Sequence, residues 1–578
     1  MTYFFATIMA MNSIIFWLKR NEKLTLGLLI VFFLFVRLPG VHLPLHQDEY
    51  KWPLISNPAT ANGVSIPHPP LSEFIYRTAG YIVGFNVNFR FVPLLFGTIN
   101  LLLLYYFVRE RFGKKEALAV STIWIFSYFS VLASLMVDTD GEIMPFFFLL
   151  ALIAYYKTQE NTARKKWWIA LLVLSCVGGF FIKVSFLLAV VALVADFLWS
   201  KKGSLNKKII LKYIGFGIAG VVGCVLLLII AHLVFPFFNL ATSVAYWEHF
   251  ANFHRDILQT MIQCVKALLY SSPFLVFIPF LSRTDDVGKV KPLIFFLICA
   301  FLFYIVIFDF SLGALDRYLQ LVVLPLSVLS GVAIVSVLKN TQRFKEVTRE
   351  KLQTFFFLSC IFSVLLLLTQ FTPHYAPPLQ PKAEWISRVL SLRWNFVYPF
   401  SGGSGPLGFY VSFLYIALTW IISFVLLIWA LFKPTLRAPL LVCILVLGGL
   451  YNLVFIEEYL FGFVNGYAAT LLSHAVEYIK NNPDIQKVTV YNDNGGNEIQ
   501  QIGKYRKRLY IDPKFDQSVK LASLNQYKEH YFVLNIPQID QHSFYQKYFN
   551  SCKIIYKEVD QQISATVYDC RNAPDVIK

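Results

Sequence analysis

Long apolar segments recur along most of the chain, and they constrain its fold more than any other feature. Each is close to the ~20 residues that an α-helix needs to cross a bilayer. Of the 578 residues, 57% are hydrophobic and 15% are charged, whereas a soluble domain has about 25% charged residues. The segments are continuously apolar rather than alternating, which favours helices over the strands of a membrane barrel. The sequence therefore predicts a polytopic, all-α membrane protein.

About thirteen transmembrane helices are predicted on this length criterion. Their approximate limits are 24–38, 88–108, 116–135, 142–157, 167–182, 184–199, 209–235, 263–281, 292–309, 318–338, 353–370, 408–432 and 439–463. A further apolar stretch at 4–18 precedes Lys19 and Arg20. A cleaved signal peptide carries its positive charge first, so we interpret this stretch as an interfacial or partly inserted helix.

The formal net charge of +17 predicts topology rather than a nucleic-acid partner. Basic clusters lie in the loops that follow the even-numbered spans, at 109–115, 164–166, 201–208 and 339–351. Short cytoplasmic loops of membrane proteins are enriched in Lys and Arg. We therefore expect the N-terminus inside, the C-terminus outside, and the basic loops facing the cytoplasm.

The composition becomes polar after residue 464, which predicts a transmembrane domain over 1–464 and a soluble domain over 465–578. Apolar residues at helical spacing between 472 and 479 predict a helix, and short apolar runs at 488–491, 531–534 and 565–568 predict strands. About 110 residues are enough for one small α/β domain, which the parity of the spans places outside the membrane. Cys552 and Cys570 could pair there if the compartment is oxidising.

Two long loops predicted on the outer side contain further helices. The loop over 39–87 has apolar residues at 71, 74 and 75, which predict a helix lying along the membrane surface. The loop over 371–407 contains a similar helix near Trp385 and then a glycine-rich connector at 401–405. Loops of this length are usually functional or disordered.

Acidic residues gather in the outer loops, beside spans that otherwise avoid charge. Asp48 and Glu49 follow the first span, and Asp138, Asp140 and Glu142 lie in the short second outer loop. A carboxylate at this depth can take a proton from an acceptor hydroxyl or bind a cation. Water-facing loop acids are the simpler interpretation of each residue alone, but two clusters at one depth favour a functional site.

Four further residues in outer positions could bind a phosphate. His68 precedes Pro69 and Pro70, Lys183 lies in a very short turn between two spans, and Arg317 and Tyr318 begin a later span. Phosphate is recognised by such cationic donors. Lys183 could equally be an interfacial lysine whose amine reaches water, and Arg317 could pair with Asp309 or Asp316. The sequence has no Walker-type glycine loop, no HExxH and no GxSxG, so ATP-driven transport has no support.

These residues resemble the GT-C type integral-membrane glycosyltransferases, and most closely the branch of the protein O-mannosyltransferases and the lipid A aminoarabinose transferase. The matching pieces are Asp48-Glu49, His68-Pro69-Pro70-Leu71, Asp140 ahead of Phe146–Phe148, Lys183 after Gly178–Ile182, and Arg317-Tyr318 with Pro325. The chain departs from the aminoarabinose branch at His68, where that branch has Lys. It also lacks the inserted outer-loop domain of the protein O-mannosyltransferases and has a C-terminal domain instead.

The resemblance implies a polyprenyl-phosphate sugar as donor and an acceptor outside the cytoplasm, either protein, lipid A or another cell-envelope glycan. It implies Asp48 as the general base, and Glu49 as a residue that positions substrate or supports Asp48. It also implies a donor-phosphate site formed by His68, Lys183, Arg317 and Tyr318. Asp140 would shape the substrate site or bind a cation, with Asp138 and Glu142 as the other candidates. Whether a divalent cation takes part stays open at this point.

A phosphate leaving group has a second pKa near ~6 and needs no general acid, so one base and a cationic site would suffice for direct displacement with inversion. A transporter or flippase of lipid-linked glycans is the alternative function. Transporters usually show repeat symmetry or charges at the membrane midplane, and neither is visible here. The expected location is the bacterial cytoplasmic (inner) membrane.

Overall fold

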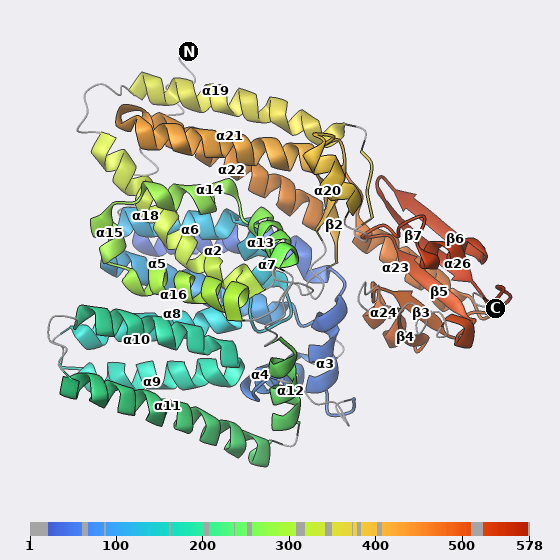
Figure 1. Ribbon diagram of the computed structural model, residues 1–578, viewed down its shortest axis with the longest axis horizontal. Helices are drawn as coiled ribbons and strands as arrows, with labels where there is room; N and C mark the ends of the chain where they lie inside the picture. The colour runs from blue at the N-terminus through green and yellow to red at the C-terminus, as the bar shows by residue number, and fades with distance from the viewer. Residues whose placement is uncertain are drawn as a thin grey trace. The chain divides into compact units, whose positions relative to one another are not determined.

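Figure 1 shows the computed structural model of the chain. It describes residues 21–60, 68–85, 88–160, 163–201, 207–235, 237–250, 257–307, 318–341, 349–372, 374–378, 383–400, 407–509 and 524–575. The chain forms two compact units, each discontinuous in sequence. Unit 1 comprises Met1–Val41, Pro53–Thr348 and Ala430–Leu441, and unit 2 comprises His42–Trp52, Arg349–Trp429 and Val442–Lys578.

Unit 1 is built from helices, as the continuous apolar segments predict. The longer ones are α2 (Glu22–Arg37), α4 (Leu71–Val83), α5 (Phe91–Arg111), α6 (Lys114–Phe126), α7 (Tyr128–Leu135), α8 (Ile143–Gln159), α9 (Lys165–Ile182), α10 (Leu187–Ser200), α11 (Lys207–Val234), α12 (Leu240–Phe250), α13 (Ile257–Tyr270), α16 (Lys291–Phe301) and α18 (Val323–Thr341). Short elements join them: η3 (Val184–Phe186), α14 (Pro273–Phe277), η5 (Ile278–Leu281), α15 (Thr284–Gly288), η6 (Leu302–Ile307) and η7 (Leu319–Val322). Helix α8 packs on α9, α6 on α5 and α18, and α10 on α16 (Figure 1).

Each predicted span has a helical counterpart, but the predicted count of thirteen is not confirmed. Within the described ranges, eight helices are long and apolar enough to cross a membrane, or ten if each of two bent pairs is one span. Three shorter apolar helices, Ile143–Gln159, Val184–Ser200 and Lys291–Ile307, lie at the remaining predicted positions. The chain is a polytopic membrane protein, with shorter helices at some positions than the span criterion requires.

The two bent pairs have local causes. Between α6 and α7 the chain bends by 66°, where Ser127 adopts an extended conformation and ends the helix. The second bend, of 108°, precedes α14 at Pro273. A proline disfavours helical geometry in the residue before it, and Ser272 is accordingly extended with ψ 154°. The pattern of apolar residues alone does not distinguish such a bent pair from one straight helix.

Unit 2 combines apolar helices with the C-terminal sheet region. Its first part contains η2 (Gln47–Tyr50), α19 (Arg349–Leu367), η8 (Leu368–Phe371), α20 (Ala383–Leu390), β1 (Val397–Phe400) and β2 (Phe409–Ser412). Helices α21 (Phe413–Phe432) and α22 (Arg437–Leu460), joined by η9 (Pro434–Leu436), belong partly to each unit, and η1 (Leu38–His42) and α3 (Lys51–Ser56) likewise cross a unit boundary in sequence.

The prediction of a span from residue 408 is wrong at its start. Residues 409–412 form β2, which pairs antiparallel with β1, and the helix begins only at Phe413. A short apolar run is compatible with either a strand or a helix, and the partner strand that decides between them comes from an earlier segment. The predicted surface helices near Leu71 and Trp385 are present as α4 and α20. The apolar stretch at 4–18 and the glycine-rich connector at 401–405 lie outside the described residues.

The C-terminal part of unit 2 is a five-stranded sheet with helices, which confirms the predicted small α/β region. Its elements are α23 (Ala468–Asn481), β3 (Val488–Tyr491), α24 (Gly496–Gln501), β4 (Tyr505–Leu509), β5 (His530–Leu534), α26 (Phe544–Asn550), β6 (Lys553–Asp560) and β7 (Ile563–Asp569). The strand order is β4-β3-β5-β7-β6; β3 is parallel to β4 and β5, and the other pairs are antiparallel.

Both faces of this sheet are covered, because alternate residues of its central strands enter different cores. Phe532 and Leu534 of β5 join α23 in one core, whereas Tyr531 and Val533 join the residues of α26 in the other. The three predicted strands are the central ones, β3, β5 and β7. The strands that sequence reasoning missed, β4 and β6, are the two edges, where charged residues face solvent and weaken the apolar pattern.

Cys552 and Cys570 form a disulfide next to the end of β7, across a sequence separation of 18 residues. Replacing both by Ser should lower the free energy of unfolding of the soluble part by about 3 kcal/mol, because the bond restricts the unfolded chain. Denaturant unfolding of the full chain in detergent measures this change, and the membrane-segment variant Cys176→Ser is the control. Labelling of both thiols in native membranes without prior reduction would contradict the pairing.

Candidate active site

Helix α4 holds two turns of unit 1 side by side. It begins directly after His68-Pro69-Pro70, so the rigid proline pair sets where the helix starts. The Ser72 hydroxyl donates to the carbonyl of Ile182 at 2.8 Å, next to Lys183. One turn later, the Tyr76 hydroxyl donates to the carbonyl of Asp138 at 3.0 Å. The turn after α9 and the loop between α7 and α8 are therefore fixed to the same helix.

The central contact of the site is a buried ion pair between these two turns. The Nζ of Lys183 lies 2.6 Å from Oδ2 of Asp140, and the two side chains are 2% and 0% exposed. Lys183 is presented by the end of α9, where its extended backbone stops the helix. Gly141 lets the acidic loop approach α7, because a Cβ there would lie 2.4 Å from the carbonyl oxygen of Ala133. A buried pair of this kind is costly to desolvate, so stability alone is a weak reason for it.

Aromatic side chains extend the ion pair into a connected cluster. The Lys183 amine lies 4.5 Å from the ring centroid of Tyr318. The Tyr318 hydroxyl shares a 2.8 Å hydrogen bond with that of Tyr246 on α12, whose ring meets His68 edge to face at 5.8 Å. Four of the predicted site residues thus come together in unit 1: His68, Asp140, Lys183 and Tyr318. Arg317, the remaining phosphate candidate, lies outside the described residues, as do Asp309 and Asp316.

Sequence reasoning missed Tyr246 as a member of this cluster. It lies on α12, between the predicted spans 209–235 and 263–281, and an isolated Tyr carries no pattern of its own. Tyr76 and Ser72, which fix the two turns, were also missed. The helical spacing of apolar residues predicts α4 from the sequence. The hydrogen bonds of Ser72 and Tyr76 could not be predicted, because they depend on which backbone carbonyls lie next to α4 in the fold.

The other acids of the loop between α7 and α8 have different surroundings from Asp140. Oδ1 of Asp138 accepts the backbone N–H of Thr139 at 2.7 Å, so this carboxylate shapes its own turn. Glu142 is fully buried and accepts a 2.6 Å hydrogen bond from the side-chain amide of Asn100 on α5. Of the three acids, Asp140 is the one whose carboxylate meets Lys183.

Asp48 and Glu49 belong to unit 2 and lie on the short helix η2. Glu49 is fully buried, and its Oε2 accepts the backbone N–H of His46 at 3.0 Å while its own N–H donates to the carbonyl of His46 at 2.9 Å. This capping box closes the turn that carries Asp48. The Asp48 carboxylate is partly exposed and forms an ion pair with Lys51, one turn further along. Glu49 therefore supports the turn, and Asp48 is the accessible acid.

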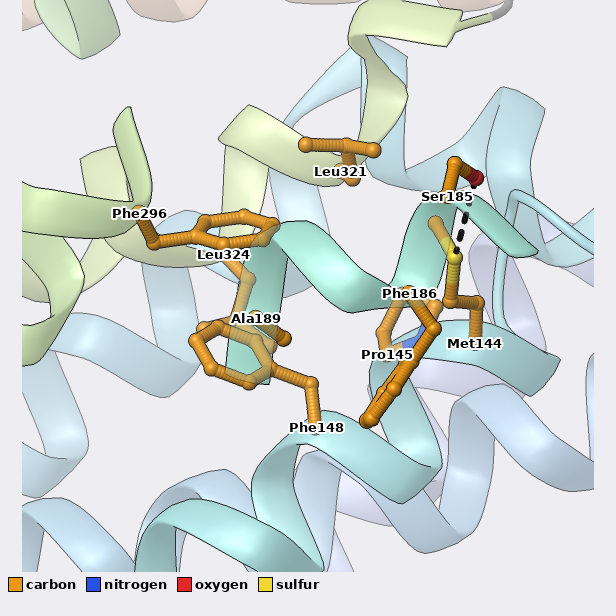
Figure 2. A pocket seen from close by; sticks show the side chains of 9 residues that line it. All are labelled: Met144, Pro145, Phe148, Ser185, Phe186, Ala189, Phe296, Leu321 and Leu324. Carbon is orange, nitrogen blue, oxygen red and sulfur yellow. Dashed lines mark hydrogen bonds between the residues drawn. The ribbon is translucent and has the colours of Figure 1, made fainter. Parts of the chain in front are cut away.

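Unit 1 contains a small apolar pocket. Some of its lining residues are close in sequence to Asp140 or Lys183. Figure 2 shows its lining side chains, which come from α8, η3, α10, α16, η7 and α18: Met144, Pro145, Phe148, Ser185, Phe186, Ala189, Phe296, Leu321 and Leu324. The Ser185 hydroxyl, its polar contribution, lies 4.0 Å from the sulfur of Met144. Met144 follows the acidic loop and Ser185 follows Lys183, so the elements that carry the charged cluster also build an apolar surface.

The charged cluster contains one carboxylate matched by one ammonium group. Among the residues that the structure describes, no group of three or more His, Cys, Asp or Glu side chains is arranged to hold a metal ion.

Comparison with known proteins agrees with this architecture. Residues 67–235 match the family model described as dolichyl-phosphate-mannose-protein mannosyltransferase. The crystal structure of ArnT from Cupriavidus metallidurans in the apo state superposes with a TM-score of 0.53 at 12% identity, covering 95% of this chain and 98% of that one. The chain has a GT-C-type fold.

The ArnT structure bound to undecaprenyl phosphate matches this chain with a TM-score of 0.54, again at 12% identity and with the same coverage. Among curated proteins, none is significantly similar in sequence. The matched segment 67–235 contains His68, Asp140 and Lys183. The solved structures thus confirm the resemblance for the fold of the whole chain. The family model supports it over residues 67–235.

Proposed function

We propose that this chain is a glycosyltransferase that moves a sugar from a polyprenyl-phosphate donor to an acceptor on the extracytoplasmic side of the membrane. The observation that carries the proposal is the buried Asp140–Lys183 pair, joined to Tyr318, Tyr246 and His68. The GT-C-type fold and the family match over 67–235 support the same reaction class.

Recognition of the donor rests on two features of unit 1. Lys183, His68 and the two tyrosine hydroxyls offer hydrogen-bond donors for a phosphate, and the lysine adds charge. Asp140 holds the lysine amine in place while the site is empty. The apolar pocket of Figure 2 is small, but its lining comes from the same elements and gives them an apolar surface of the kind that an isoprenoid chain contacts. A water-soluble nucleotide sugar has no long apolar chain that could pack against such a surface.

Asp48 is the proposed general base. It would accept the proton of the acceptor hydroxyl as that oxygen attacks the anomeric carbon, and the bond from that carbon to the phosphate oxygen would break. The phosphate leaves without a general acid, because its second pKa is near ~6. One displacement inverts the anomeric configuration. Retaining enzymes instead use a carboxylate as nucleophile to form a covalent intermediate.

The proposed location is a bacterial cytoplasmic membrane with the site and the C-terminal domain outside. The disulfide between Cys552 and Cys570 supports an oxidising compartment for that domain. The acceptor is proposed to be a protein or a cell-envelope glycan such as lipid A.

A reconstituted assay tests the function. The purified chain in liposomes is given a polyprenyl-phosphate donor with a labelled sugar, together with extracytoplasmic acceptor fractions. Transfer of label with release of polyprenyl phosphate is expected, and NMR of the product should show an inverted anomeric centre. Movement of the labelled lipid between leaflets without any sugar transfer would instead establish the flippase alternative. Mass spectrometry of co-purifying lipids identifies the donor.

Replacing Tyr246 by Phe should raise the KM for the lipid donor about fivefold. The change removes one hydroxyl and its hydrogen bond to Tyr318, and such a bond contributes about 1 kcal/mol. Steady-state transfer at varied donor concentration measures it. Tyr81→Phe is the matched control, because that ring is 67% exposed on the same unit. An unchanged KM in the Tyr246 variant would remove this residue from the donor site.

A further inference from the structure

The soluble domain places a rigid loop at the carboxyl end of its central parallel strand. Residues 492–495 follow β3 and lead into α24. In α/β domains, the crevice at the carboxyl ends of parallel strands is where ligands usually bind. Here α24, which this loop leads into, packs against η2, the short helix that carries Asp48. A segment of the first outer loop therefore lies against the part of the fold that normally receives a ligand, and both belong to unit 2.

Asp493 is the polar contact between this loop and η2. Its carboxylate is 1% exposed and accepts hydrogen bonds from two tyrosine hydroxyls. One is Tyr505 at the start of β4, at 3.0 Å from Oδ1. The other is Tyr50, the last residue of η2, which donates to Oδ2. Burial and the neighbouring Asp493 carboxylate raise the pKa of the Tyr50 hydroxyl, so it keeps its proton and remains the donor.

The loop that presents Asp493 is held from several sides. The side-chain amide of Asn494 donates to the carbonyls of Leu534 and Ile536 at the end of β5, at 3.3 Å each. Asp493 itself has a φ of +59°, a conformation that costs energy for a residue with a side chain. At Gly496 a Cβ would lie 2.3 Å from Oδ1 of Asp493, so a larger residue would displace the carboxylate. Several independent contacts of the domain thus fix the position of the Asp493 carboxylate.

Helix η2 is equally constrained on its own side. The Glu49 capping box closes its first turn, and the flanking Leu45 and Trp52 are 5% exposed. Asp48 lies two positions before the end of this element, with its carboxylate in the partly exposed position. Tyr50 is the side chain of η2 that reaches the buried carboxylate of the soluble domain.

We infer that Tyr50 and Asp493 are positioning residues through which the C-terminal domain fixes the orientation of the Asp48 carboxylate. The inference rests on the proposed function, in which Asp48 is the base. The soluble domain would then contribute to catalysis, because it binds the turn that carries Asp48 at the place where α/β domains usually bind a ligand. Loss of the contact leaves the base present but free to rotate away from the acceptor hydroxyl.

Two variants of the full-length protein in liposomes test this inference by kinetics. Tyr50→Phe and Asp493→Ala should each lower kcat for sugar transfer by about 10- to 100-fold, because a displacement of about 1 Å has this effect on catalytic groups. The KM for the lipid donor should stay within about twofold, since the donor-binding cluster lies in unit 1. The double variant should be little slower than either single variant, because both remove the same contact.

Tyr556→Phe is the matched control, because Tyr556 also donates its hydroxyl to a carboxylate, that of the partly exposed Glu558, within the same sheet. It should leave kcat unchanged. Hydrogen exchange provides a readout that needs no activity: the amides of residues 46–51 should exchange at least about tenfold faster in Asp493→Ala than in the wild type or in Tyr556→Phe.

The outcomes separate the inference from the proposed function. If Asp48→Asn abolishes transfer while Tyr50→Phe and Asp493→Ala keep wild-type kcat and exchange rates, the positioning role is wrong and the function stands. A fall in kcat shared equally by Tyr556→Phe would show general destabilisation and would also overturn it. If the wild type transfers no sugar, or Asp48→Asn is fully active, the proposed function fails and takes the inference with it.

Discussion

Sugar transfer by the Asp48→Asn protein should fall by about 10²- to 10⁴-fold, the usual effect of losing a general base. The amide has the size and hydrogen-bonding reach of the acid but cannot accept the acceptor proton. Asp48 is the accessible carboxylate of η2, whereas Glu49 is buried in the capping box. The KM for the donor should change little, because the phosphate contacts of unit 1 remain.

Glu49→Gln is the matched control for this prediction, since it makes the same acid-to-amide change one residue further along. Its amide oxygen still accepts the N–H of His46, so the turn should hold and transfer should fall by less than about tenfold. Initial rates of transfer from the labelled lipid donor compare the two variants. Equal losses in both, or wild-type rates in Asp48→Asn, would contradict the assignment of the base.

Replacing Lys183 by Met should abolish detectable transfer and also destabilise unit 1 by about 3–5 kcal/mol. The loss of stability follows because the change leaves the Asp140 carboxylate buried without its ion-pair partner. Denaturation in detergent, monitored by tryptophan fluorescence, measures the stability. Lys157→Met is the control, because its partner carboxylates on Glu110 and Glu160 are 41% and 46% exposed, and a surface pair contributes about 0–1 kcal/mol.

A double variant separates the structural and functional parts of this pair. Asp140→Asn together with Lys183→Met removes both charges, so most of the stability lost in Lys183→Met should return. Transfer should remain abolished, because the phosphate would still lack its cation. Recovery of transfer along with stability would mean that the pair only holds the fold together and does not bind the donor.

The candidate site was predictable where its residues carry a local pattern. Asp48-Glu49 and His68-Pro69-Pro70 are adjacent in sequence, and the short turn at Lys183 follows from the length of two apolar runs. The choice between Asp138 and Asp140 depends on contact with Lys183, 43 residues away from Asp140. Tyr246 and Asp493 had no local signal, because each acquires its contacts from an element far away in sequence.

The membrane class, the positions of most helices and the central strands of the soluble domain follow from the sequence alone. Hydropathy and side-chain alternation are properties of consecutive residues. Each segment therefore shows in its own sequence whether it can bury an apolar face. The bends at Ser127 and Ser272, the edge strands β4 and β6, and the partners of Asp140 and Asp493 come from the folded chain. A hydrogen bond or an ion pair depends on atoms lying within about 3 Å of each other, and such proximity between distant segments is created only by packing.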